Sequence, residues 1–211
     1  MQKKEDNKVE AIEGIDHLKE GATEFCKLIF IMKDQLKSPN LTIVFISGMV
    51  GYSCQAVMLE KKQNYNLVKT NNGKNYIFGD SLNYYLIGSK YSFYNILMGQ
   101  FHNKLPEHDL IKIEPFLTNV ASNIGNEKYL IKDIFNPEKI FDFEFYRSTW
   151  KNFSETLNKY CKTADEWPIL FSIAMTKFLD IIDSSYGRDS YVYFTTIALE
   201  NAIYVSKISQ I

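Results

Sequence analysis

Apolar residues recur every three or four positions over long parts of the chain, a spacing that predicts amphipathic helices. The first such stripe runs from Ile15 to Leu36, with charged residues lying between the apolar positions. A second stripe runs from Tyr146 to Tyr160 and predicts a long helix that ends near Lys162. Because side chains three and four residues apart share one face of a helix, we expect both stripes to face a common core.

Residues 41–59 include no charged side chain, and Pro39 after Ser38 suits a helix start, so a helix is predicted over 39–62. Its apolar length approaches the roughly 20 residues that a membrane span needs. A helix that is apolar all round can equally be the central helix of a globular protein. Since Ser47 and Gln55 are polar and amphipathic helices flank the segment, we expect a buried core helix, with a membrane span as the alternative.

A different pattern follows the uncharged segment and predicts an inserted β-hairpin over residues 66–78. Short apolar runs lie on both sides of Asn72-Gly73, a dipeptide that tolerates the positive φ angles of a two-residue type I′ turn. After Gly79, Asp80 is expected to cap a short helical turn over residues 81–83.

The remaining patterns are helical and complete the predicted fold. Helices are expected over 92–104, 116–124, 165–184 with Asp165 as the cap, and 190–206, with a short strand at 129–131. The predicted fold is therefore mainly α, α+β at most, with about seven helices packed around the central helix. A single globular domain over residues 1–211 is expected, with a flexible N-terminus at 1–7.

The amino-acid composition limits the cellular compartment and the kinds of partner that we expect. Lys+Arg 24 against Asp+Glu 25 gives a net charge of -1, which offers no global attraction to nucleic acid or to an anionic membrane. The three cysteines, Cys26, Cys54 and Cys161, are far apart and fit free thiols in a reducing cytoplasm. The abundance of Lys, Asn, Ile and Tyr is typical of an AT-rich bacterial genome. We therefore expect a cytoplasmic bacterial protein that binds neither nucleic acid nor membrane.

Evidence for catalysis or metal binding is weak. Cys54, with His102 and Asp80 as partners, is the candidate nucleophile, but a reactive cysteine needs a lowered pKa and Cys54 falls in the middle of a predicted helix. We favour a small buried residue in tight helix packing. His17 is expected to be solvated, and His108 beside Asp109 is too little for a metal site. No cofactor or metal is expected.

Candidate binding residues fall into two groups. The abundance of aromatic residues, with 14 Tyr and 15 Phe, favours an interaction surface, because tyrosine is enriched at interfaces. The tyrosine group comprises Tyr84, Tyr85, Tyr91 and Tyr94, with Trp167 as an anchor between helices. The polar group comprises Gln55, Ser81 and Asn83.

The sequence contains no GxGxxG, GxxxxGKS or GxSxG motif, so common nucleotide-binding and hydrolase chemistry has no support. We therefore expect a non-catalytic protein that acts by binding a protein partner or a second copy of itself. The alternative is a small-molecule-binding protein or enzyme. Its pocket would lie between the central helix and the hairpin–helix junction, lined by Cys54, Gln55, Asp80 and His102.

Overall fold

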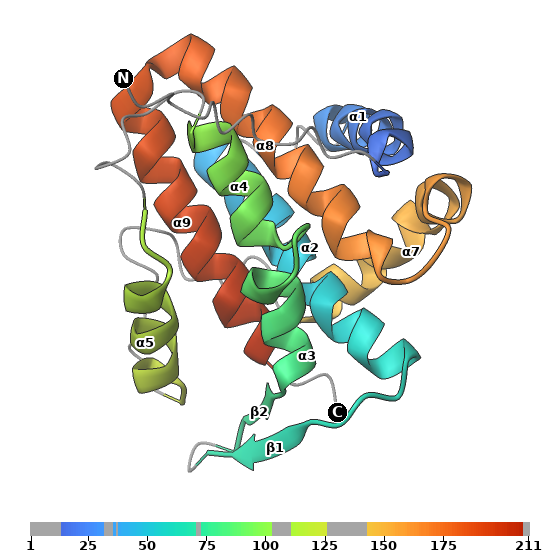
Figure 1. Ribbon diagram of the computed structural model, residues 1–211, viewed down its shortest axis with the longest axis vertical. Helices are drawn as coiled ribbons and strands as arrows, with labels where there is room; N and C mark the ends of the chain where they lie inside the picture. Colours follow the sequence, from blue (N-terminus) through green and yellow to red (C-terminus); the bar gives the residue numbers. More distant parts are fainter. Residues whose placement is uncertain are drawn as a thin grey trace, which may run out of the picture.

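The computed structural model describes residues 14–31, 36, 38–70, 73–102, 111–125 and 143–208, with the backbone alone at 101 and 102. The predicted strand at 129–131 and the N-terminus at 1–7 lie outside the described residues. The described part confirms the mainly α prediction, with seven helices of ten residues or more (Figure 1). These are α1 (Asp16–Ile31), α2 (Pro39–Glu60), α4 (Phe93–His102), α5 (Glu114–Asn123), α7 (Phe143–Tyr160), α8 (Glu166–Tyr186) and α9 (Arg188–Lys207). Shorter elements are β1 (Asn66–Lys69), β2 (Asn75–Phe78), α3 (Asp80–Asn83) and a π-helical turn η2 (Tyr84–Gly88).

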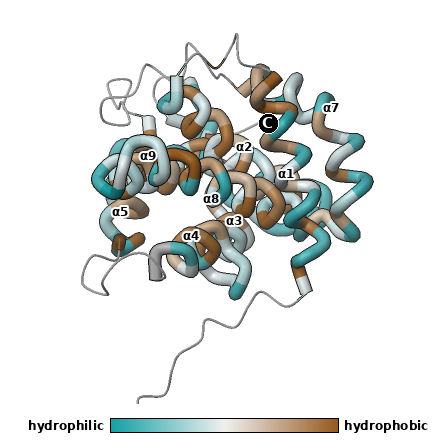
Figure 2. The backbone as a smooth tube through the Cα atoms, turned by 90° about the horizontal axis from the view of Figure 1, so that it is seen from above, coloured by the Kyte–Doolittle hydropathy of each residue, from teal (hydrophilic) through white to brown (hydrophobic). Residues whose placement is uncertain are grey.

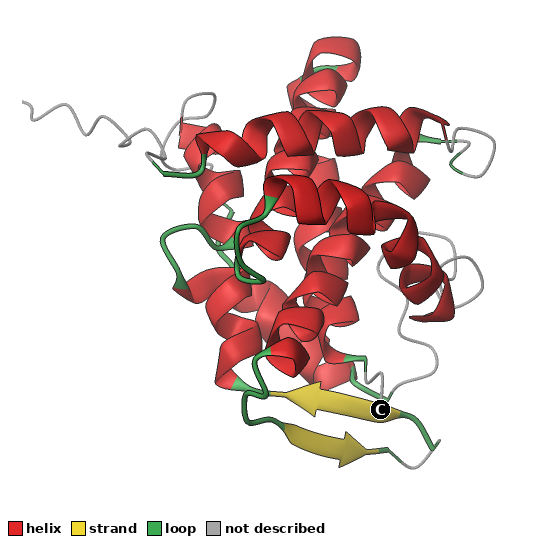
Figure 3. Cartoon of the chain, turned by 90° about the vertical axis from the view of Figure 1, so that its right-hand side faces the viewer, coloured by secondary structure: helices red, strands yellow, loops and turns green. Residues whose placement is uncertain are grey.

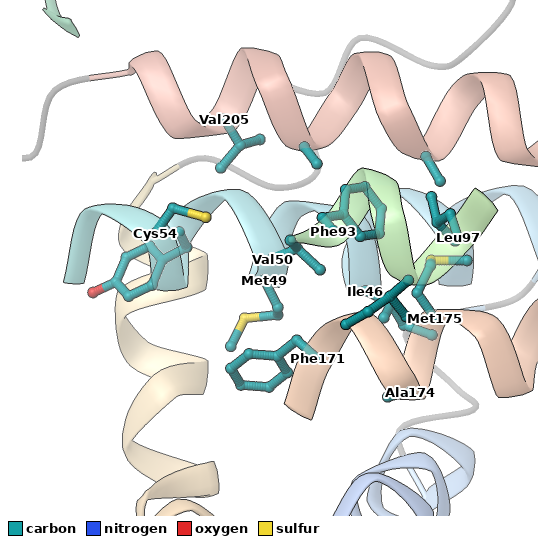
Figure 4. Close-up of a cluster of buried hydrophobic side chains, with 14 of the residues drawn as sticks. Ile46, Met49, Val50, Cys54, Phe93, Leu97, Phe171, Ala174, Met175 and Val205 are labelled. Carbon is teal, nitrogen blue, oxygen red and sulfur yellow. The ribbon is translucent and has the colours of Figure 1, made fainter. Parts of the chain in front are cut away.

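Helix α2 is the buried central helix that the uncharged segment predicts. Every residue from Thr42 to Gln55 is buried, and the helix packs chiefly against α9 and α8. Figure 4 shows its apolar side chains between those of α4, α8 and α9, with Ile46 and Val50 near Phe93 of α4. Among the described residues α2 alone is long and apolar enough to cross a membrane, and 89% of its most apolar 18-residue window is buried.

Small residues let α2 approach its neighbours closely. A methyl group on Gly51 would lie 2.4 Å from the carbonyl oxygen of Ala202 in α9, so only glycine fits that contact. Nearby, Nδ2 of Asn201 donates to the carbonyl of Val44 at 2.8 Å and to Oγ of Ser47 at 2.9 Å. These bonds fix how α9 is rotated against α2, because both partners are fully buried.

The outer helices α1 and α7 bury the stripes that their sequences predict. The Phe25 ring of α1 lies 4.5 Å from the Phe153 ring of α7 and 4.8 Å from the Phe171 ring of α8, measured between centroids. The solvent side of α7 is hydrophilic (Figure 2). The predicted first helix continues to Leu36, whereas α1 is described to Ile31 and the next four residues lie outside the described part.

The hairpin is confirmed at the predicted position and lies at one end of the helical bundle (Figure 3). Its predicted two-residue turn is wrong. The Thr70 N–H donates to the Lys74 carbonyl and the Gly73 N–H donates to the Thr70 carbonyl, so Thr70 pairs with Lys74 and three residues lie between them. Gly73 has a φ of 81°, the left-handed conformation that a three-residue hairpin loop requires. Strand β2 buries Tyr76 and Ile77, while every β1 residue is exposed.

Two predicted helix caps have different outcomes. The Asp80 prediction is wrong, because Gly79 occupies the N-cap position and Asp80 is the first helical residue of α3. Asp165 does occupy the N-cap position of α8, which places Pro168 in the first turn as predicted. Its side chain, however, caps no backbone N–H and accepts a hydrogen bond from the Tyr85 hydroxyl instead.

Candidate functional site

A cavity of about 300 Å³ lies where the hairpin meets α3, the end of α9 and the segment that follows α2. We call it the hairpin pocket; its lining includes the predicted residues Asp80 and Asn83, but neither Cys54 nor Gln55. The other residues that line it are Asn64, Tyr65, Asn66, Phe78, Gly79 and Lys207. The cavity lies at the hairpin–helix junction, but no residue of the central helix α2 lines it. Of the described side chains that were predicted to line a small-molecule pocket there, Asp80 does so and Cys54 and Gln55 do not.

Lys207, the last residue of α9, supplies the positive charge of this pocket. It is only 6% exposed, and its Nζ donates to Oδ1 of Asn83 at 2.9 Å and lies 5.7 Å from the centroid of the Phe78 ring. It forms no ion pair with any described residue, and Asp80 lines the same pocket without reaching it. Burial lowers the pKa of Lys207 to about 8, which the neighbouring Cys54 opposes.

Gln55 positions the end of α9 rather than lining the pocket. Its Nε2 lies 3.0 Å from the Val205 carbonyl oxygen and 2.9 Å from that of Ser206, and it also contacts the Ile208 carbonyl. These carbonyls belong to the last turn, where a helix leaves acceptors without partners of its own. Because Lys207 lies within this turn, the Gln55 side chain of α2 holds the backbone that carries the lysine in place.

Cys54 is fully buried, and burial raises the pKa of its thiol to about 12, an effect that Lys207 partly opposes. That environment favours the thiol, whereas a nucleophilic cysteine needs the thiolate at neutral pH. The proposed partner His102 ends α4, and its side chain lies outside the described part of the structure. The catalytic hypothesis for Cys54, His102 and Asp80 therefore stays a prediction.

The four predicted tyrosines occupy different environments. Tyr84 is 55% exposed and Tyr91 is half-buried. The other two hydroxyls are engaged inside the fold, since Tyr94 donates to the Ile111 carbonyl at 2.9 Å and Tyr85 donates to Asp165 Oδ1 at 2.5 Å. An interface at this cluster would therefore have Tyr84 as its most exposed aromatic side chain.

Asp165 links three segments of the chain. Besides the Tyr85 hydroxyl, its carboxylate accepts a hydrogen bond from the ammonium group of Lys61, at the end of α2. Partial burial raises the pKa of this carboxyl, but the bonds from Lys61 and Tyr85 outweigh it and hold the pKa below its ordinary value. These contacts join the start of α8 to η2 and to the end of α2. The Tyr85 hydroxyl therefore has a structural role in holding these elements together.

The remaining candidates also contact parts of the fold. Trp167 is half-buried with its ring edge-to-face against Trp150, 5.3 Å between centroids, which matches the predicted anchor between helices. Ser81 is half-buried in α3 and does not line the pocket. His17 donates from Nε2 to Glu166 at 3.1 Å, while His108 lies outside the described residues. Within the described ranges, no three His, Cys, Asp or Glu side chains gather as a metal site.

A second hollow, of about 590 Å³, lies between the end of α1, the start of α2 and the end of α8. We call it the apolar groove; its lining is largely apolar and includes Phe30, Leu36, Phe178, Ile181 and Tyr186. Phe30 is 54% exposed and Tyr186 is 62% exposed. The sequence analysis did not single out this surface, although Phe30 lies off the apolar stripe of its helix, which is the signal that could have found it.

The sequence analysis did not single out Lys207 either. Lys207 follows Leu199 and Ile203 at helical spacing, so it continues a buried stripe. A lysine in the last turn of a helix, however, is usually interpreted as solvated. Comparisons with known proteins add no further constraint on either surface. No protein-family model matches the chain, and no curated protein or solved structure matches it.

Proposed function

We propose that this chain is a non-catalytic protein that works by association, and that its apolar groove receives a second copy of the chain. One observation carries the proposal. Of the nine large hydrophobic side chains that are exposed among the described residues, three line this groove: Phe30, Ile181 and Tyr186. Contiguous exposed apolar surface of this kind is characteristic of interaction sites.

The exposed area is of the size that an interface core requires. A free aromatic side chain presents roughly 150–250 Å², so Phe30 and Tyr186, each more than half exposed, leave about 200 Å² of aromatic surface in water. A stable interface buries about 800 Å² on each partner, and its energy concentrates in a few central aromatic residues. The groove supplies such a centre, and the polar surface around it would form the rim.

A second copy of the chain is the occupant that we propose for this surface. Ile31 is 79% exposed at the end of α1 and directly follows Phe30, which lines the groove. A two-fold axis between two copies would place the same apolar surface of each copy against that of the other. With a net charge of -1, two copies repel each other only weakly. The free thiols Cys26, Cys54 and Cys161 are compatible with the bacterial cytoplasm in which we propose that the protein acts.

Sedimentation equilibrium of the wild type, Ile181→Glu and Val68→Glu tests this proposal. The two variants are matched, because Ile181 is 45% exposed in the groove and Val68 is 44% exposed on the hairpin. A buried carboxylate without a partner costs more than the 1.4 kcal/mol that corresponds to tenfold. We therefore expect a wild-type dimer, at least tenfold weaker association for Ile181→Glu, and no change for Val68→Glu. A wild type that stays monomeric at about 100 μM, or equal weakening in both variants, would contradict the proposal.

A further inference from the structure

The hairpin pocket contains a buried cation without an anionic partner. Lys207 is almost fully buried and forms no ion pair with a described residue. An ammonium group has three donors, and the one hydrogen bond that the structure gives Lys207 goes to Asn83. Proteins normally pair buried charges, because removing an ion from water is costly. A pocket that opens onto such a group is therefore suited to a ligand that brings the missing negative charge.

The contacts around Lys207 hold it in one position. Gln55 of α2 bonds to the last turn of α9, and an isolated β-bridge between Ile208 and Tyr76 joins the residue after Lys207 to strand β2. The Phe78 ring lies beneath the ammonium group, which attracts the cation without neutralising it. The lysine is therefore held in one place before any ligand arrives, which reduces the entropy cost of binding.

The other residues of the pocket limit what kind of anion fits. Asn64 and Asn66 contribute amide groups, which bind hydroxyl or amino groups by hydrogen bonds. Asp80 adds a carboxylate on the exposed side, so a ligand with negative charge at both ends would be repelled. A volume of about 300 Å³ is at the lower end for ligand sites and suits a small metabolite.

From this arrangement we infer that the hairpin pocket binds a small carboxylate that carries hydroxyl or ammonium groups at its other end. The carboxylate would pair with Lys207, and the hydroxyl or ammonium groups would bond to Asp80 and the asparagine amides. The lowered pKa of Lys207 agrees with this assignment, since burial disfavours the charged amine that a carboxylate would stabilise. This inference does not depend on the proposed association at the apolar groove.

The direct test is a titration of the ¹⁵N-labelled full chain, followed by NMR, with four probes. L-serine and glycerate carry the carboxylate with hydroxyl or ammonium groups; glycerol has the hydroxyl groups without the carboxylate; inorganic phosphate replaces the carboxylate by a different anion. We expect saturable shifts at Gly79 and Asn83 with L-serine or glycerate, and none with glycerol at the same concentration. No saturable shift with either carboxylate, equal shifts with glycerol, or saturation by phosphate alone would overturn the inference.

Two pocket variants and one control locate the anion. Lys207→Gln removes the charge, and we expect at least tenfold weaker binding, whereas Lys69→Gln on the exposed strand β1 should bind as the wild type does. Asn83→Asp places a carboxylate against Lys207 and supplies the missing counterion from within the protein. It should therefore abolish binding while raising the thermal midpoint, a combination that does not depend on Lys207→Gln being folded. Wild-type affinity in Asn83→Asp or in folded Lys207→Gln would refute the assignment of Lys207.

Discussion

Replacing Gly51 by alanine tests whether the close contact between α2 and α9 is a real constraint on the fold. The added methyl group would lie 2.4 Å from the Ala202 carbonyl oxygen and 2.8 Å from the Ser206 nitrogen, both of them backbone atoms of α9. No side-chain rotation can relieve such a clash. The two helices must separate, and with them the buried bonds that Asn201 makes to α2.

The expected magnitude is the difference of two effects. Inserting a group into a packed core costs about 1–3 kcal/mol, whereas alanine in place of glycine stabilises a helix by about 1 kcal/mol. A net loss of up to about 2 kcal/mol is therefore expected for Gly51→Ala, and a larger loss for Gly51→Leu. For a chain of this length, 1 kcal/mol corresponds to about 2–4 °C in the thermal midpoint.

Gly99 in α4 provides the matched control. A methyl group there meets no heavy atom within 4 Å, so Gly99→Ala should gain helix propensity without strain. Urea denaturation and thermal melting followed by circular dichroism would measure both variants. We expect Gly51→Ala to unfold earlier than the wild type and Gly99→Ala to unfold later. Opposite shifts, or equal shifts of the same sign, would show that the α2–α9 contact is not as tight as described.

Three other consequences of the structure can be measured. Because burial raises the pKa of Cys54 to about 12, this thiol should react with an aromatic disulfide reagent only in denaturant. Cys54→Ser should therefore leave the labelling rate of the folded protein unchanged, and a slower labelling rate in that variant would contradict the expectation. Tyr85→Phe should cost about 1 kcal/mol at neutral pH. Since the pKa of Asp165 is lowered, its pairing stabilises the protein above the ordinary carboxyl pKa and is lost in acid, so the cost should shrink there; a constant cost would refute the link. The pKa of Lys207 falls from 10.5 to about 8, so its charge destabilises the folded state below pH 8 and this penalty disappears as the pH rises toward 10.5. Lys207→Met should therefore stabilise the protein more at pH 7 than at pH 10, by at most about 3 kcal/mol in the free energy of unfolding measured with urea. The neighbouring titratable groups Cys54 and Asp80 are present in both proteins. If the free-energy difference between variant and wild type did not depend on pH, this would count against a buried ammonium group.

Local patterns predicted most of the fold, because periodicity and caps are properties of neighbouring residues. The stripe of α1 placed Phe25 in the core, and the stripe of α7 did the same for Tyr146. Residues 66–78 gave the hairpin within its observed bounds. The loop type was wrong because the hydrogen-bond pairing of Thr70 with Lys74, and not the Asn-Gly dipeptide alone, decides how many residues connect the strands.

Contacts between distant segments were beyond the reach of the same reasoning. The cap position of Asp165 was predictable from its local sequence, but its partner Tyr85 is 80 residues away and outcompeted the backbone N–H groups. Lys207 meets Asn83 over 124 residues, so no spacing along the chain could reveal their pairing. The residues Asp80 and Asn83 of the candidate site were therefore predicted, but its buried cation, Lys207, was absent from the prediction.

The polar residues of α2 explain how a helix without charge over residues 41–59 can serve as a protein core. Ser47 and Gln55 bond to groups of α9, and Gly51 lies against the α9 backbone, so the residues that interrupt the apolar surface are matched to one neighbour. If α2 instead crossed a membrane apart from α9, the Gln55 amide would lack the carbonyls of the last α9 turn as partners. Placing it in lipid would then cost free energy. The same amide holds the turn that contains Lys207. Packing of the central helix and placement of the pocket cation thus depend on one interface, and changes at Gly51 should disturb both.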